Sequence, residues 1–318
     1  MAGTVLSLVL PVQGAATQAE TTLTSLSPQY QSFSDGVAEL LVIEAPSDDM
    51  LGDARARANR EHVRYLRVEA GPGARARSIA LGLAESRAPF VGVFTDAAHL
   101  VTPRTLDTAR RALALDDHPL VILPDYRFDE TKVGGAGTIE GEQRFLEQRD
   151  WRKNPYDLFS AARFGPSTPN GALSPLLGAA CLFAPKPSFD AIGAIDPRLD
   201  MPGGAALKLW MYTELARLPK TCLIVLAGEG AFRQHHPELD IASVRNDESS
   251  VQNLLFSAVA ALPGFEAVHR EPLAFGTVPG PALPFLAESA ALAEYHCAAC
   301  RARGAASWYV DPTDVSAR

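Results

Sequence analysis

"FVGVFTDAAHLVTP" (residues 90–103) decides the fold, because it joins a short apolar run to an acidic residue and then to the start of a helix. The apolar run is typical of a buried strand. Similar runs occur at "TVLSLVLP" (4–11), "AELLVIE" (38–44), "VRYLRVE" (63–69) and "LVILPDYRF" (120–128). Amphipathic stretches at 73–87 and 102–115 alternate with these runs. The alternation predicts an α/β fold, with a mostly parallel sheet and helices on both faces.

The later chain continues this pattern with an interruption. Residues 131–150 are polar and Gly-rich, which predicts a loop. We then expect a strand at 174–185, a short helix and turn at 188–200, a helix at 204–218, a strand at 221–228, a capped helix at 247–262 and a final helix at about 285–303. Ligands bind at the carboxyl ends of strands in such sheets. Asp96 and Glu44 are at those ends.

Composition limits the classes of function. Nearly half of the 318 residues are apolar, and the net charge is −8. A general nucleic-acid binder would show a basic balance, so we expect no nucleic-acid partner. The first apolar run is too short to span a bilayer and lacks a signal-peptide pattern, so we expect no transmembrane segment and a cytoplasmic protein. The four cysteines include two in apolar runs, which favours a reducing compartment.

Several stretches together resemble the family 2 glycosyltransferases, which have the GT-A nucleotide-sugar fold. The stretches are "LSLVLPV" (6–12), "LLVIEAPSDD" (40–49), "GARARSIALGLAES" (73–86), "FVGVFTDAAHLVTP" (90–103), "DWRKNPYDLF" (150–159), "FDAIGAIDPRLDMPGG" (189–204) and "LAGEGAFRQHHPE" (226–238). The resemblance implies a GT-A-like domain over residues 1–240 and a C-terminal helical extension over 241–318. It also implies a nucleotide-sugar donor, an acceptor and a divalent metal, Mn or Mg.

The resemblance also implies a set of donor-binding residues: Pro11, Glu44, Asp49, Arg77 and Asp96. For Glu44, Asp49 and Arg77 the sequence leaves an alternative open. A glutamate at a strand end can be an ordinary polar residue, a turn aspartate can cap a helix, and an arginine on an amphipathic helix commonly belongs to a solvated face.

The metal element departs from the family pattern. Asp96 matches its first acid, but Ala98 stands where the second acid belongs. His99 is adjacent, and a bulge or turn would be needed to bring its side chain round. His236 matches a histidine that lies near the metal in relatives. Asp96, His99 and His236 therefore form a candidate three-ligand site, for which the alternative is hydrogen-bonded or surface histidines.

The acceptor side is also altered. Gly178, Ala179 and Ala180 replace polar residues, which indicates a dry and uncharged wall. The acid expected of a general base is absent, with Lys208 near its place. Asp200 is the candidate catalytic residue, reaching the site from the preceding turn.

Two functions remain open. The first is a glycosyltransferase that moves a sugar from a nucleotide-sugar to an unknown acceptor. The second is a catalytically inactive GT-A-fold protein that binds a nucleotide, a sugar or a protein partner. A nicotinamide-binding domain is excluded, because the turn after the first strand lacks Gly-x-Gly-x-x-Gly. "HCAAC" (296–300) lacks a second cysteine pair for zinc, so it is interpreted as part of a C-terminal helix that packs on the domain, on a partner or on a second copy.

Overall fold

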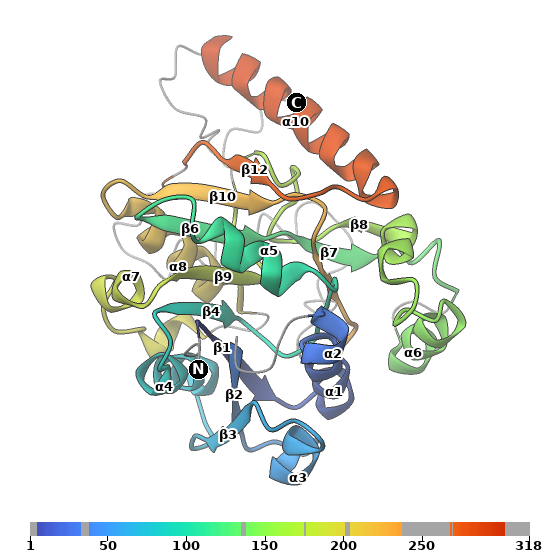
Figure 1. The fold of residues 1–318 in the computed structure, drawn as a ribbon, viewed down its shortest axis with the longest axis vertical. Helices are drawn as coiled ribbons and strands as arrows, with labels where there is room; N and C mark the ends of the chain where they lie inside the picture. The colour runs from blue at the N-terminus through green and yellow to red at the C-terminus, as the bar shows by residue number, and fades with distance from the viewer. Residues whose placement is uncertain are drawn as a thin grey trace.

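The computed structural model describes residues 5–32, 38–134, 138–174, 176–200, 204–236, 268 and 270–302. Within them the main sheet has eight strands, stacked from β12 to β3 in the order β12-β10-β6-β9-β4-β1-β2-β3 (Figure 1). In chain order the strands of this sheet are β1 (Leu6–Gln13), β2 (Ala38–Ala45), β3 (Val63–Arg67), β4 (Phe90–Phe94), β6 (Pro119–Leu123), β9 (Cys181–Pro185), β10 (Cys222–Leu226) and β12 (Leu273–Phe275).

The sheet is mostly parallel, and β9 is the exception. Strand β9 runs antiparallel to both of its neighbours, β4 and β6. The remaining pairs in this sheet are parallel. The α/β class expected from the sequence is therefore confirmed.

Helices cover both faces of the main sheet, because its central strands are apolar on both sides. On one face, α1 (Ala16–Ser25) and α5 (Thr105–Ala112) pack on residues such as Leu8 of β1. On the other face, α4 (Ala74–Glu85), α7 (Lys186–Ala191) and α8 (Ala205–Arg217) pack on residues such as Val9. The shorter helical segments are α2 (Pro28–Gln31), α3 (Gly52–Arg57), η1 (Pro155–Ala161), η2 (Pro197–Leu199) and η5 (Gly280–Ala282).

A second sheet of four short strands lies beside the carboxyl ends of the main one. Its order is β5 (His99–Val101), β11 (Ala231–Arg233), β7 (Asp125–Phe128) and β8 (Ala162–Phe164). One face is aromatic, with Tyr126 and Phe232 stacked at 5.6 Å between ring centroids and Phe285 edge-on to Tyr126 at 5.0 Å. This aromatic face packs against η1 and the C-terminal helix.

Three expected elements differ from the structure. The strand expected at 120–128 is two strands in different sheets, because the chain turns at Pro124 between β6 and β7. The expected loop at 131–150 contains helix α6 (Ile139–Gln148), whose first turn is capped by the Thr138 hydroxyl accepting from the Gly141 N–H at 3.0 Å. The strand expected at 174–185 is reduced to β9.

The C-terminal segment contributes a strand as well as a helix. Strand β12 extends the main sheet by pairing with β10, and α10 (Leu283–Ala302) crosses that edge of the molecule (Figure 1). The helix expected at 247–262 is outside the described residues, so the division at 240 and 241 stays a prediction. In the part of the chain that the structure describes, no helix is long and apolar enough to cross a membrane.

Candidate functional site

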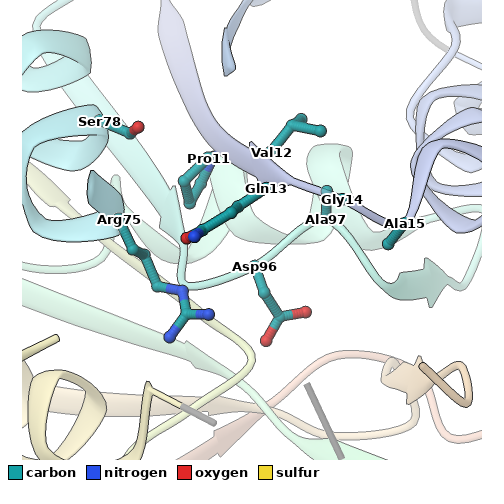
Figure 2. A pocket seen from close by; sticks show the side chains of 9 residues that line it. All are labelled: Pro11, Val12, Gln13, Gly14, Ala15, Arg75, Ser78, Asp96 and Ala97. Atoms are coloured by element: carbon teal, nitrogen blue, oxygen red, sulfur yellow. The ribbon is translucent and has the colours of Figure 1, made fainter. Parts of the chain in front are cut away.

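A cavity lies where β1 and β4 end. Its lining comes from the end of β1 and the turn after it, from α4 and from the turn after β4: Pro11, Val12, Gln13, Gly14, Ala15, Arg75, Ser78, Asp96 and Ala97. Figure 2 shows the side chains of Arg75 and Asp96 extending to the same side of the strand end. Of the predicted donor-binding residues, Pro11 and Asp96 line this cavity.

The turn that forms the cavity wall is held by the loop after β2. The Gly14 N–H donates to the Ser47 hydroxyl at 3.0 Å, and the Ala16 N–H donates to Asp49 Oδ2 at 2.9 Å. Asp49 therefore caps α1 rather than the helix that follows it in the chain, and it does not line the cavity. It shapes the site by fixing the backbone that does.

Glu44 is at the end of β2 and is fully buried. Its carboxylate accepts hydrogen bonds from the N–H groups of Leu51 and Gly52, at 2.6 and 2.9 Å, and from the Tyr65 hydroxyl at 2.5 Å. These three donors anchor the start of α3 and the neighbouring strand β3. The network favours the structural alternative for Glu44, since the side chain is directed away from the cavity lining.

Arg75, and not Arg77, is the arginine at the cavity. Arg77 donates to the carbonyl oxygens of Pro72 and Glu69 and so braces the loop before α4. Arg75 is 7% exposed, and its Nη1 lies 3.2 Å from Asp200 Oδ1. The Arg75 N–H also donates to Asp200 Oδ2 at 2.9 Å. The candidate base Asp200 is thus held by Arg75 and positions that guanidinium.

Asp96 is buried in a network of its own. One oxygen, Oδ1, lies 2.9 Å from His99 Nδ1 and accepts from the Ala98 N–H at 3.1 Å. The other, Oδ2, lies 3.5 Å from Lys208 Nζ. Burial raises the pKa of the Asp96 carboxyl, but the interactions with His99 and Lys208 outweigh burial and hold the pKa well below its usual range. Asp96 is therefore ionised at neutral pH.

Lys208 reaches Asp96 from α8, with a side chain only 4% exposed. Burial lowers the pKa of this ammonium, and the charge of Asp96 raises it. Gly178 makes room for the side chain, because a Cβ on Gly178 would lie 2.9 Å from the Lys208 Cβ. The small residues that indicated a dry wall therefore accommodate a buried charge.

The predicted three-ligand metal site is not assembled. Among the residues that the structure describes, no group of three or more His, Cys, Asp or Glu side chains is placed to hold a metal ion. His99 contacts Asp96 through the turn at 95–98, and His236 is buried, but the two do not form a ligand cluster with Asp96. A cation on Asp96 Oδ2 would also approach the Lys208 ammonium. The donor set does not fit a divalent metal.

Sequence reasoning missed Asp125, the first residue of β7. Its side chain is fully buried, and its Oδ1 lies 3.9 Å from His99 Nε2, so His99 stands between two carboxylates. Gly165 approaches closely, with 2.5 Å between a Cβ placed on it and the Asp125 Cγ. The signal was available in "LPDYRF", where an acid follows an apolar run as Asp96 does.

Comparisons with solved structures find chains of similar shape at low identity. No protein-family model and no curated protein sequence matches the chain. Full TarS of S. aureus aligns with a TM-score of 0.49 and 14% identity over 83% of this chain, which spans 44% of TarS. Residues 1–349 of TarS in complex with UDP-GlcNAc give 0.46 and 13% over 84% of this chain and 68% of theirs.

The mannosyltransferase PcManGT from Pyrobaculum calidifontis, in complex with GDP-Man and Mn²⁺, aligns with a TM-score of 0.43 and 13% identity over 100% of this chain and 79% of its own. Because all three TM-scores are below 0.5, we draw no functional conclusion from the likeness.

Proposed function

We propose that the chain is a glycosyltransferase-like protein that binds the diphosphate of a nucleotide-sugar in the cavity at the ends of β1 and β4. The observation that carries the proposal is the buried Arg75 guanidinium, which lines this cavity beside Asp96. Asp200 contacts this guanidinium through Oδ1, at 3.2 Å from Arg75 Nη1, and accepts a hydrogen bond from the Arg75 backbone N–H through Oδ2. An oriented arginine at the carboxyl end of a parallel sheet is suited to recognise a phosphate.

The proposed binding uses side chains where the family resemblance implies a metal. A diphosphate carries negative charge that increases as the sugar leaves, and preorganised cations stabilise such charge. Arg75 is at the cavity wall, and Lys208 lies behind Asp96 with its ammonium buried. We expect nucleotide binding that does not require Mn or Mg.

A second candidate is a binding protein without transfer activity, and the state of the carboxylates favours it. Transfer to a hydroxyl ordinarily uses a carboxylate as general base. Asp96 is paired with His99 and Lys208, and Asp200 is paired with Arg75. Asp125 is fully buried and does not line the cavity.

The first test is calorimetric titration of the full chain with UDP-, GDP- and dTDP-sugars, in EDTA and in Mn²⁺. We expect one nucleotide to bind with equal affinity in both buffers. Arg75→Gln should weaken this binding at least tenfold, whereas Arg87→Gln, an exposed arginine at the opposite end of β4, should leave it unchanged. Absence of binding by every nucleotide-sugar would reject the proposal.

The two candidates differ in turnover. With the bound nucleotide-sugar, release of free nucleoside diphosphate in the presence of acceptor extracts would identify a transferase. Tight binding with no release above the buffer rate would identify the non-catalytic binder. The Arg75→Gln variant is the negative control for both measurements.

A further inference from the structure

The register of the small sheet places four basic residues in one row. His99 of β5 is opposite Arg233 of β11, Arg233 is opposite Arg127 of β7, and Arg127 is opposite Arg163 of β8. Residues directly opposite each other project from the same face of a sheet. The row therefore crosses the whole width of this sheet.

The row lies on the face opposite to the aromatic one. Side chains alternate between faces along a strand, so Tyr126 and Phe128 point into the aromatic core while Arg127 points away from it. The row begins at His99, which contacts Asp96 at the cavity. The charge of Arg233 also acts on both Asp96 and Lys208. The basic row thus runs outward from the proposed donor cavity.

Arg127 and Arg163 are directly opposite each other, and the charge of Arg163 acts on Arg127. Burial lowers the pKa of Arg127 most, and the charge of Arg163 lowers it further. Among the described residues, the Nε atoms of Arg127 and Arg163 are buried with no hydrogen-bond partner. The acids nearby are Asp125, and Glu130 at 3.9 Å from Arg163. Like charges directly opposite in a sheet are destabilising, so an anion bound by Arg127 and Arg163 would stabilise this pair of strands.

We propose that the basic row binds a phosphate group carried by the acceptor, with Arg127 and Arg163 as its principal donors. Arginines bind phosphate through paired N–H donors, and among the described residues the Nε groups of Arg127 and Arg163 have no hydrogen-bond partner of their own. Neighbouring strands are about 4.8 Å apart, so the row from Arg233 to Arg163 spans about 10 Å. The row begins beside the donor cavity, where His99 contacts Asp96. The assignment of this phosphate to the acceptor rests on the proposed function.

The test uses NMR of the full chain labelled with ¹⁵N, observing the arginine Nε–H signals. The probes are inorganic phosphate and diethyl phosphate, at constant ionic strength in chloride. We expect inorganic phosphate to shift the Arg127 and Arg163 signals, and Arg127→Gln to raise its dissociation constant at least fivefold. Arg163→Gln, which changes a side chain already 35% exposed, provides a second variant if the first is unstable. Arg87→Gln is the control and should change the constant less than twofold.

The outcomes separate the two proposals. Equal phosphate binding by the wild type and both variants, or unmoved Arg127 and Arg163 signals, would overturn the phosphate site. Loss of nucleotide-sugar binding in Arg127→Gln would overturn its assignment to the acceptor, because the row would then serve the donor. If no nucleotide-sugar binds while phosphate still shifts these signals, the proposed function fails and the phosphate site stands. If diethyl phosphate also shifts these signals, the phosphate group of the acceptor is a phosphodiester. If only inorganic phosphate shifts them, it is a terminal phosphate.

Discussion

Replacing Asp96 with asparagine should destabilise the protein more than replacing Lys208 with methionine, and the two effects should not add. Asp96→Asn leaves the Lys208 ammonium and His99 buried without the carboxylate that both contact. Lys208→Met keeps the length of the side chain and leaves Asp96 with His99 and the Ala98 N–H. In the double variant the lysine charge is absent, so the penalty of burying it unpaired is absent too.

The distances give the magnitudes. At 3.5 Å and an effective dielectric constant of about 20, the attraction between Asp96 and Lys208 is about 5 kcal/mol. Burial of the ammonium opposes it, as the lowered pKa of Lys208 shows, so the net value of the pair is smaller. Removing one member of a buried pair costs about 3–5 kcal/mol, which we expect for Asp96→Asn. For Lys208→Met we expect about 1–2 kcal/mol, with a coupling of about 2 kcal/mol between the two.

Urea unfolding of the wild type, both single variants and the double variant measures this coupling. The expected result is that Lys208→Met is neutral or stabilising in the Asp96→Asn background. Lys186→Met, which changes a half-buried lysine at the other end of β4, is the control and should show no coupling. If Lys208→Met costs the same in both backgrounds, within about 0.5 kcal/mol, the ion pair does not organise the site.

Three further predictions concern pH and backbone. The folded pKa of Asp96 lies below the ordinary value of 3.8, so the ionised carboxylate stabilises the protein above about pH 4 and this stabilisation is lost as the pH falls. In urea unfolding, Asp96→Asn should therefore reduce the loss of unfolding free energy at acid pH. Burial raises the pKa of Glu229, so stability falls as the pH rises above about 4.5, and Glu229→Gln should remove that slope. Gly178→Ala should destabilise the protein by about 1–3 kcal/mol through backbone strain at its φ of +141°, and further through the contact of the new Cβ with Lys208. Gly193 has a φ of +81° and open space around it, so Gly193→Ala should show backbone strain alone. Thermal melts of the two variants compare these costs.

The main sheet could be predicted from the sequence because its strands are buried on both faces. Such strands appear as continuous apolar runs, so those at β1, β2 and β4 are visible without knowledge of their neighbours. The small sheet could not be predicted in this way. Strands β5, β8 and β11 have three residues each, which is too short to show a period of two. Their positions depend on pairing between distant parts of the chain.

The candidate site also contains residues that the sequence predicts and residues that it does not. The strand-end position of Asp96 followed from the apolar run before it, and the structure places it at the cavity. Its partners come from elsewhere, since Lys208 is on α8 and Arg233 on β11. Arg75 and Arg77 are two positions apart on one helix, and only the tertiary contact with Asp200 decides which one lines the cavity. Sequence patterns alone do not contain that contact.

The departures from the metal element are consistent with one another. Ala98 stands where a second acid was expected, and it is fully buried against Ala15 at the cavity. Lys208 brings a positive charge to the acid that remains, and Gly178 leaves the space that Lys208 occupies. A buried charge without a partner is strongly destabilising, so such charges need counterions inside the protein. Asp96 faces the Lys208 ammonium and His99, and Arg75 faces Asp200. The buried charges of the candidate site are thus compensated within the protein.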